Sequence, residues 1–443
     1  MLGFSKKEKK KKVVILGIDG VPCSLLRDFI RRGVMPNLGA LACDGTLIDM
    51  TASLPEVSST SWTTCMTGVN PGKHNIFGFM DLKADSYEFR FPNSHDIGSE
   101  MIWEILGRKG RRSVVLNVPS TYPAKPFPGI LTAGFVALDL QKATYPDAAY
   151  TYLKSIHYRM DVDSKKVSVS PELFLEDMEH TFKTRREAIL HFYDHEEWDF
   201  FIGTITETDR LHHFFWSAYG DDAHPLHSAF IDFYKNIDGL IGEIAQRCGK
   251  DIPLMLVSDH GFAAIKQEIY LNSWLREKGF LQFRKESPDS LMDMHPGSKA
   301  FALDPSRIYI NLKDRYPSGS VGHEQYGTLR ARIREALLEL SVDGEKVIRE
   351  IFFKEDIYQG PFFESAPDLV ALAHRGFDLK GSLNKNTLVG RSIFTGAHTR
   401  DDATCFLNRR VNPERVNIID IAPTVFQLLG TEHQAFEGRS LLR

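Results

Sequence analysis

Short apolar runs alternate with longer amphipathic stretches along most of this chain. The short runs have the length of buried strands, and the longer stretches carry apolar residues at helical spacing. The predicted strands are 13–18, 113–117, 199–205, 253–257 and 368–372. The predicted helices are 23–32, 59–67, 98–109, 171–192, 226–247, 325–341 and 417–429. This alternation predicts an α/β fold with a three-layer α/β/α core, in which helices cover both faces of a mostly parallel sheet.

Residues 271–365 break the alternation. They contain a polar stretch with proline and serine, an apolar run, a turn-rich segment and one amphipathic helix. Such a mixture predicts a smaller α+β subdomain, which we expect to be a cap inserted into the core. The core would then consist of residues 13–270 and 366–443, preceded by residues 1–12 as a basic, disordered tail.

The composition is that of an ordinary globular protein, with 42% hydrophobic and 25% charged residues in a chain of 443. No apolar run approaches the roughly 18 residues that cross a bilayer, and the first residues lack the apolar region of a secretory signal. The five cysteines are an odd number without CxxC spacing, which indicates free thiols in a reducing compartment. We therefore expect a cytoplasmic protein.

The net charge of −4 hides an uneven distribution. Residues 6–12 contain six lysines and one glutamate, a net +5, so the rest of the chain carries −9. A basic tail can contact nucleic acid, anionic lipid or a ribosome, but a solvated start is the simpler interpretation. The chain has neither a basic stripe with interleaved aromatics nor zinc-finger spacing, so we expect no nucleic-acid or membrane binding.

Six side chains that can bind metal lie at or near the ends of predicted strands, where ligands collect in open α/β sheets. They are Asp19, Asp209, His213, Asp259, His260 and His398. Three carboxylates, three imidazoles and a nearby serine are what a two-metal phosphoryl-transfer site requires. Ordinary alternatives exist, such as helix capping for Asp19 or a plain loop position for His398.

The spacing of these residues in the sequence supports their interpretation as metal ligands. Asp209 and His213 are four residues apart, so one helical turn places both on one face, although such pairs are also common on solvated faces. His212 points away from that face unless it supports the site indirectly. Asp259 and His260 directly follow a strand, and Gly261 permits the turn that brings both to one site. A structural salt link is the alternative for this pair.

Ser58 stands before a segment that reads as the opening of a helix. A hydroxyl there lies beside unpaired backbone N–H groups, which also bind phosphoryl oxygens. Metal coordination would activate this serine as a nucleophile, whereas without metal Ser58 or Ser59 would only cap the helix. His74 is a further candidate, which we interpret as a structural histidine bonded to nearby backbone.

The order Asp, Ser, Asp-x-x-x-His, Asp-His and His resembles the alkaline phosphatase superfamily. The segments ILGIDGV, PEVSSTSWTTCMTG, SDHGF and GAHTR look like landmarks of its type I phosphodiesterase/nucleotide pyrophosphatase group, and the resemblance covers nearly the whole chain. It implies an alkaline-phosphatase-like core and a metal-dependent phosphoric ester hydrolase. A phosphodiesterase acting on a small, nucleotide-like phosphorylated substrate is the first expectation.

The resemblance also implies a role for each candidate residue. Asp209, His213 and His398 would hold one divalent ion. Asp19, Asp259 and His260 would hold the second, with Ser58 beside it as the nucleophile that forms a phosphoseryl intermediate. Zn²⁺ suits both ligand sets, and Mn²⁺ would also suit the second set with its two carboxylates.

Residues after Ser58 depart from the family pattern. Ser61 stands where nucleotide pyrophosphatases carry a phosphate-binding asparagine, and we expect Ser59, Ser61 and Trp62 to contact substrate. Thr60 and Trp62 replace the proline and arginine that sulfatases require, which argues against a sulfatase. A phosphomonoesterase, a metal-dependent phosphomutase and a non-catalytic, metal-stabilised binding protein are the alternatives.

Overall fold

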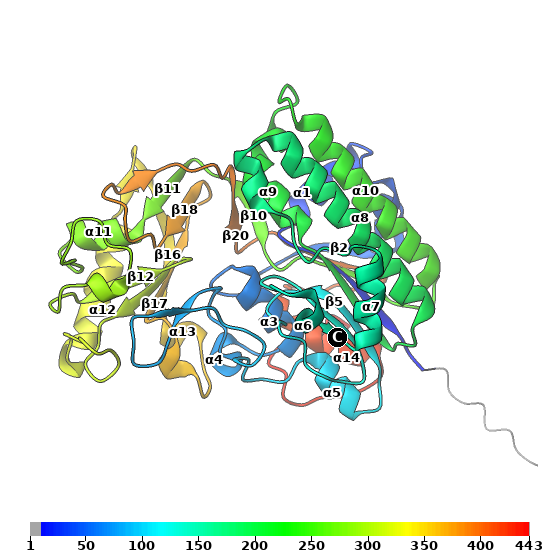
Figure 1. Ribbon diagram of the computed structural model, residues 1–443, viewed down its shortest axis with the longest axis horizontal. Helices are drawn as coiled ribbons and strands as arrows, with labels where there is room; N and C mark the ends of the chain where they lie inside the picture. The colour runs from blue at the N-terminus through cyan, green and yellow to red at the C-terminus, as the bar shows by residue number, and fades with distance from the viewer. Residues whose placement is uncertain (1–9, 443) are drawn as a thin grey trace, which may run out of the picture.

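An eight-stranded sheet lies at the centre of the larger part of the molecule in the computed structural model, which describes residues 10–442 (Figure 1). Its strands, in spatial order, are β2 (Thr46–Met50), β21 (Ala403–Leu407), β9 (Leu254–Val257), β1 (Val13–Ile18), β8 (Phe200–Ile205), β5 (Ser113–Val118), β6 (Gly129–Ala133) and β7 (Thr144–Tyr145). The five strands from β9 to β6 are parallel, and the outer strands are antiparallel to their neighbours. The predicted mostly parallel sheet is confirmed.

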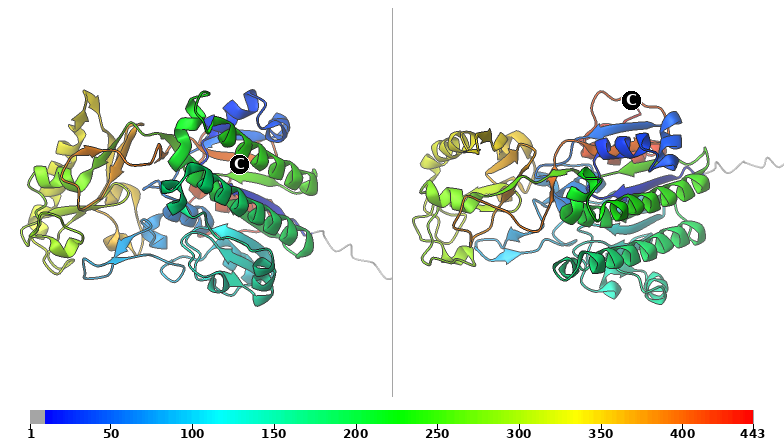
Figure 2. Two further views of the ribbon diagram at one scale, coloured as in Figure 1. Left: turned by 45° about the horizontal axis from the view of Figure 1, so that its top comes forward. Right: turned by 90° about the horizontal axis from the view of Figure 1, so that it is seen from above.

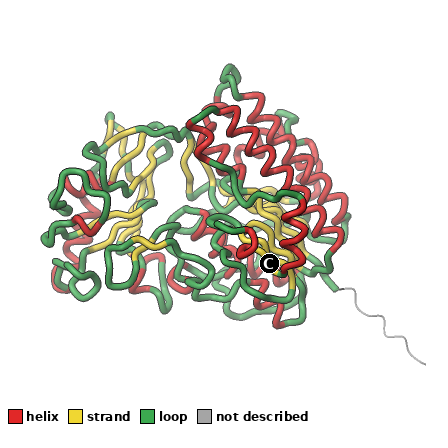
Figure 3. The backbone as a smooth tube through the Cα atoms, viewed as in Figure 1, coloured by secondary structure: helices red, strands yellow, loops and turns green. Residues whose placement is uncertain are grey.

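Helices cover both faces of this sheet because its strand residues alternate between two apolar clusters. Val14, Leu16 and Ile18 of β1 belong to one cluster, and Val13 and Ile15 belong to the other. The helices of the first face include α1 (Cys23–Arg31), α8 (Pro171–His195), α9 (Glu207–Gly220) and α10 (His227–Cys248). Those of the second face are α3 (Ser58–Thr67), α5 (Ile102–Arg108) and α14 (Ile421–Leu428). Figure 3 shows the strands enclosed between these two helical layers.

A second unit lies beside the core (Figure 2). Its four-stranded antiparallel sheet consists of β12 (Ala300–Leu303), β13 (Arg307–Ile310), β17 (Leu369–Ala373) and β16 (Ile348–Phe353). A three-stranded sheet of β18 (Phe377–Lys380), β11 (Gln267–Tyr270) and β19 (Val389–Gly390) adjoins it, with helices α11 (Leu271–Glu277) and α12 (His323–Leu338). The apolar residues of these elements form a cluster of their own.

This second unit draws on residues from both sides of the expected insertion, 271–365. Strand β11 precedes that range, and β17 and β18 follow it. The predicted strand 368–372 is β17, which pairs with β13 and β16 and does not join the main sheet. An apolar run identifies a strand, but its pairing partners lie far away in the sequence. The division into a core and a cap at 271 and 365 therefore stays a prediction.

The seven predicted helices are found within four residues of their predicted limits, the last as a 3₁₀ turn (Ile418–Asp420) followed by α14. The remaining helices are α2 (Pro36–Asp44), α4 (Pro71–His74), α6 (Leu140–Ala143), α7 (Asp147–Ser155) and α13 (Lys354–Ile357). Short 3₁₀ helices lie at Ser164–Ser168, Leu291–Asp293 and Phe363–Ser365. The remaining strands are β3 (Asp81–Leu82), β4 (Phe89–Arg90), β10 (Gly261–Ala264), β14 (Ser341–Val342), β15 (Glu345–Lys346) and β20 (Gly396–Thr399).

Three other sequence expectations concern the whole chain. Nine of the twelve residues of the predicted basic tail lie outside the described residues, and Lys12 Nζ lies 4.2 Å from the centre of the Trp198 ring. All five cysteines fall in the described part of the chain and are free. Of the helices that the structure describes, none combines the length and apolar character needed to span a bilayer.

Candidate active site

Three neighbouring parallel strands bring the acidic candidates together. Strands β9, β1 and β8 lie side by side and end at the same edge of the sheet. Asp19 follows β1 directly, Asp259 follows β9 after one residue, and Asp209 lies in the first turn of α9 after β8. All three carboxylates are buried. The sequence separation between them is large, but parallel pairing places them within one small volume.

Asp19 is fixed by hydrogen bonds on both carboxylate oxygens. Its Oδ1 accepts from Ser58 Oγ at 3.1 Å, and its Oδ2 accepts from Trp62 Nε1 at 2.8 Å. Gly20 has a φ of +67°, so the chain turns sharply after Asp19, and the Gly20 amide donates to Asp259 Oδ1 at 3.0 Å. This turn joins the ends of β1 and β9 and holds two carboxylates next to each other.

Ser58 is the first residue of α3 and lies against two of the predicted ligands. Its Oγ is 3.1 Å from Asp19 Oδ1 and 3.2 Å from His260 Nε2. The residue before it is Val57, whose side chain cannot accept a hydrogen bond from the first turn of the helix. The N–H groups of that turn and the positive end of the helix dipole are therefore available to phosphoryl oxygens.

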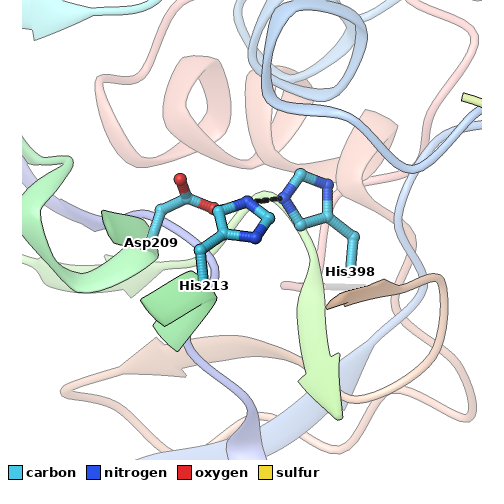
Figure 4. Close-up of side chains that lie close together, drawn as sticks. All are labelled: Asp209, His213 and His398. Atoms are coloured by element: carbon cyan, nitrogen blue, oxygen red, sulfur yellow. Dashed lines mark hydrogen bonds and ion pairs between the residues drawn. The ribbon is translucent and has the colours of Figure 1, made fainter. Parts of the chain in front are cut away.

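Asp209, His213 and His398 form a tight group (Figure 4). His398 Nε2 lies 3.1 Å from Asp209 Oδ1 and 3.0 Å from His213 Nε2. The Nδ1 atoms of the two histidines lie 3.1 Å and 2.9 Å from the backbone carbonyls of Gly396 and Glu56. With Nδ1 donating to those carbonyls, both Nε2 atoms are directed at Asp209 and are free to bind a divalent cation. When no metal is bound, burial lowers the pKa of His398, but Asp209 outweighs this effect and raises it.

His260 and Asp259 lie on the other side of Asp209. His260 Nε2 is 3.3 Å from Asp259 Oδ2, 3.7 Å from Asp19 Oδ1 and 4.0 Å from Asp209 Oδ1. Asp259 Oδ2 is buried, and no hydrogen-bond partner reaches it from the described residues. Asp19, Asp209 and His260 form a second group of potential ligands, so Asp209 is common to both groups. The orphaned oxygen and the donor set fit a second divalent ion.

The electrostatics indicate that this pocket holds more carboxylates than its own positive charges can compensate. Burial raises the pKa of Asp19 well above its usual value, and repulsion from Asp259 and Asp209 adds to the effect. Burial also raises the pKa of Asp259, to about 7. It lowers the pKa of His213 and His260 to about 3, so both imidazoles are neutral and can act as ligands. Divalent ions would displace the protons from the carboxylates and compensate their charge.

Arg210 is a supporting residue that the sequence interpretation missed. Its guanidinium donates to Asp209 Oδ2 at 3.1 Å and to Asp161 Oδ2 at 2.8 Å, and it lies 4.5 Å from the centre of the Phe135 ring. Burial raises the pKa of Asp209, but His213, His398 and Arg210 outweigh this effect and hold it well below the usual value. Because Arg210 occupies Oδ2, the other oxygen of Asp209 faces both ligand groups. In the sequence, the one indication of this role was that Arg210 directly follows Asp209.

His212 supports the site indirectly, as its position in the helix allowed. Its Nδ1 lies 2.9 Å from the Gly20 carbonyl oxygen, and its Nε2 lies 2.7 Å from the Tyr234 hydroxyl. The imidazole thus ties the turn after Asp19 to α10. Thr208 adds a second tie, because its hydroxyl donates to the Asp19 carbonyl oxygen at 2.6 Å.

The other candidates on and near α3 are buried. Trp62 bonds to Asp19, and Ser61 Oγ lies 2.7 Å from Ser53 Oγ. Ser59 Oγ has no hydrogen-bond partner among the described residues. Contact of Ser59, Ser61 and Trp62 with substrate stays a prediction. His74 Nε2 lies 2.9 Å from Thr64 Oγ1, and its Nδ1 accepts from the Ile76 amide, as expected of a structural histidine.

A cavity of about 300 Å³ adjoins this site between the core and the second unit. His213 and His398 contribute to its lining from the core side, together with Phe79. Asp378 and Lys380 contribute from strand β18 of the second unit. The candidate metal ligands are therefore accessible to a small molecule from the junction of the two units.

Comparisons with known proteins identify the family of this chain and its fold. Residues 13–401 match the family model described as type I phosphodiesterase / nucleotide pyrophosphatase. No curated protein sequence matches the chain. Phosphonoacetate hydrolase from Sinorhizobium meliloti 1021, solved with phosphonoacetate, is 16% identical with a TM-score of 0.65, over 95% of this chain and 96% of that chain. An inactive murine ectonucleotide pyrophosphatase / phosphodiesterase 5, solved with AMP, is 14% identical with a TM-score of 0.58, over 97% of both chains.

Proposed function

The chain belongs to the type I phosphodiesterase / nucleotide pyrophosphatase family, and we propose that it hydrolyses phosphodiesters with two divalent metal ions and Ser58 as the nucleophile. The observation that carries the proposal is the place of Ser58 Oγ, 3.1 Å from Asp19 Oδ1 and 3.2 Å from His260 Nε2. A serine hydroxyl held between two potential ligands at an uncapped helix start is poised to attack phosphorus.

Six side chains would hold the ions. Asp209, His213 and His398 form one set, and Asp19, Asp259 and His260 form the other. The ions, when bound, would stabilise the serine alkoxide and the charge on the phosphoryl oxygens. Imidazole and carboxylate ligands favour Zn²⁺, and the second set with its two carboxylates also suits Mn²⁺.

The residues of the chain account for binding and for the transfer itself. The N–H groups of the first turn of α3 would hold the phosphoryl oxygens beside Ser58. Ser58 Oγ forms a bond to phosphorus while the bond from phosphorus to the leaving ester oxygen breaks. Ser58 loses its hydroxyl proton in this step, and the leaving alcohol takes up one proton. Water then attacks the phosphoseryl group, so that Ser58 regains its proton and the phosphomonoester is released.

The ligands of related structures agree in size with such a substrate. Phosphonoacetate and AMP, bound in two of those structures, are both small phosphorus-containing molecules. The cavity of about 300 Å³ beside His213 and His398 has room for a group of that kind. We therefore expect a small phosphorylated substrate.

The decisive experiment compares two substrate classes. Purified protein loaded with Zn²⁺ or Mn²⁺ is assayed with bis(4-nitrophenyl) phosphate as a diester and 4-nitrophenyl phosphate as a monoester. We expect hydrolysis of the diester at the higher kcat/KM, and loss of both activities after chelation. A preference for the monoester would identify a phosphomonoesterase. Hydrolysis of neither substrate would overturn the proposal in favour of a phosphomutase or a binding protein.

The five free cysteines also support a proposed cytoplasmic location, since thiols stay reduced in that compartment. Fractionation of cells that express the full chain tests it. Recovery of the protein in a membrane or extracellular fraction would contradict the proposal.

A further inference from the structure

The cavity beside the candidate site is lined by part of that site. Among the described residues, His213 and His398 belong to the lining, as do Glu56 and Val57, whereas Ser58, Asp19 and His260 are absent from it. The His260 and His398 rings stack at 3.7 Å between centroids, so His260 lies behind His398 as seen from the cavity. In an in-line displacement the nucleophile and the leaving group lie on opposite sides of phosphorus. A cavity that Ser58 does not line is where a leaving group would depart.

Strand β18 of the second unit supplies the charged wall of this cavity. Asp378 and Lys380 line the cavity together with Phe377 and Leu379, which also belong to the apolar cluster of that unit. Lys380 Nζ and Asp378 Oδ2 are 2.7 Å apart. Both side chains are largely buried, with 26% and 14% of their surface exposed. Desolvation makes such a pair costly to bury, and further hydrogen bonds to its free oxygen and N–H groups offset this cost.

The same pair lies close to the candidate metal ligands. Lys380 Nζ is 5.6 Å from the centre of the Phe394 ring, and that ring centre is 5.2 Å from the ring of His213. A group leaving phosphorus beside His213 would therefore meet the face of Phe394 first and the Asp378–Lys380 pair next. Phe79 adds a second aromatic side chain to the lining.

The charge of the cavity constrains what it can receive. Among its described lining residues, four are aspartate or glutamate and four are lysine or arginine, so the formal charge is balanced. A phosphate leaving group, as in the cleavage of a pyrophosphate, would bring several negative charges into a cavity whose side chains carry no net positive charge. Hydroxyl groups suit it better, because they donate to a carboxylate and accept from an ammonium group. Aromatic walls with a few polar groups are typical of sites for small organic groups.

We propose that this cavity receives the leaving alcohol of the substrate, and that Asp378 and Lys380 select an uncharged alcohol that carries several hydroxyl groups. The inference rests on the proposed function and narrows it to diesters of such alcohols, as opposed to pyrophosphates. The bond from phosphorus to the oxygen of this alcohol breaks as Ser58 Oγ bonds to phosphorus, and the alcohol leaves with the proton that Ser58 gives up.

Three diesters separate the leaving side from the retained side. In bis-glyceryl phosphate, glycerol is both the leaving and the retained group. In glyceryl 4-nitrophenyl phosphate, nitrophenol leaves and glycerol is retained. In bis(4-nitrophenyl) phosphate, glycerol is absent. Each is assayed with the metal-loaded full chain and with the double variant Asp378→Leu with Lys380→Met, which removes both charges and leaves neither partner unpaired.

We expect the double variant to lose about tenfold or more in kcat/KM for bis-glyceryl phosphate, because hydrogen bonds to charged groups are lost. The other two diesters should change by less than about threefold. The exposed pair Lys285 and Asp289, also in the second unit, provides the matched control as Lys285→Gln with Asp289→Asn, which should change none of the three. Wild-type protein should also prefer bis-glyceryl phosphate to diglyceryl diphosphate, whose leaving group is charged.

Other outcomes of these assays would contradict either the inference or the proposed function. An equal loss on glyceryl 4-nitrophenyl phosphate would place the retained group in the cavity and overturn the inference. An equal loss on all three diesters would reduce Asp378 and Lys380 to a structural role, and a preference for the diphosphate would refute the selection of uncharged alcohols. A wild-type protein that hydrolyses the aryl diester but not bis-glyceryl phosphate would also overturn the inference and leave the proposed function intact. Hydrolysis of no diester at all would refute the proposed function itself.

Discussion

His213 and His398 face each other, Nε2 to Nε2, at 3.0 Å, although 185 residues separate them in the sequence. Each ring places its Nδ1 against a backbone carbonyl, from Gly396 and Glu56 respectively, and both Nε2 atoms lie within 3.4 Å of Asp209 Oδ1. Burial lowers the pKa of His398, but Asp209 outweighs this effect and raises that pKa, so a proton can lie between the two side chains when no metal is bound. A divalent cation would replace that proton and take both Nε2 atoms and the carboxylate as ligands.

Replacing Ser58 with alanine should abolish turnover and leave the metal content intact. The hydroxyl makes the bond to phosphorus, so kcat/KM should fall by roughly 10³-fold or more, as expected when a nucleophile is removed. Diester hydrolysis and metal analysis on the same samples check both statements. Ser155→Ala, on the exposed end of α7, is the control and should behave as wild type. Undiminished turnover in Ser58→Ala would remove the serine from the mechanism.

Replacing Asp259 with asparagine should cost the protein one of two bound ions. The change removes the charge of Oδ2, the buried oxygen that lacks a hydrogen-bond partner among the described residues. Without the metal, the same variant should unfold at a higher temperature than wild type, because the repulsion that raises the pKa of Asp19 is reduced. Elemental analysis and thermal unfolding with and without chelator measure the two effects, with exposed Asp314→Asn as the control. Two ions retained would contradict the assignment of Asp259.

Replacing Arg210 with methionine should weaken metal binding without removing a ligand. Asp209 Oδ2 would lose its donor at 3.1 Å, and the carboxylate would be free to rotate away from the histidines. Loss of such an outer partner typically lowers metal affinity by about 10–100-fold. Titration of the metal-free protein with Zn²⁺ measures the change. The control is Arg186→Met, which removes an arginine whose salt bridge joins two helices. It should leave the affinity for Zn²⁺ unaltered. An unaltered affinity in Arg210→Met would show that Asp209 needs no such support.

Replacing Asp177 with asparagine should destabilise the protein at neutral pH but less so in acid. Burial raises the pKa of Asp177, but hydrogen bonds from Lys166, the Asp163 amide and Arg159 outweigh it and hold the pKa below the usual range. A carboxylate with a lowered folded pKa stabilises the fold above the unfolded pKa, about 4, and loses that contribution as the pH falls through the folded pKa. Thermal unfolding between pH 7 and pH 2 should show the difference from wild type shrinking below about pH 4. A constant difference would contradict this account.

The sequence indicated which residues of the candidate site lie together, because their chemistry is local and the pairing of parallel strands follows a general rule. Asp19 and Asp259 come directly or almost directly after apolar runs, and Asp209 follows a third run. Parallel strands share a carboxyl edge, so residues at these positions meet whatever lies between them in the sequence. His398 could be placed only through the resemblance to a family, since β20 pairs with β10 and nothing in its own residues specifies that partner.

Long-range pairings account for what could not be predicted. Strand 368–372 has the apolar character of the core strands, yet it pairs with β13 and β16 of the second unit. Arg210 stands next to Asp209 in the sequence, but its second partner, Asp161, lies 49 residues away in an irregular stretch. The sequence pattern of either segment alone does not indicate which other segment it will contact.

The sequence by itself determined the kinds of elements, the set of potential metal ligands and the serine beside them, because periodicity and residue chemistry are local properties. Only the tertiary structure decided that Asp209 is common to both ligand groups, that Arg210 occupies its outer oxygen, and that Asp378 and Lys380 face the same cavity as His213. The reason is physical. A side chain's chemistry belongs to the residue, whereas its neighbours, its burial and therefore its charge state are set by the packing of segments that lie far apart in the chain.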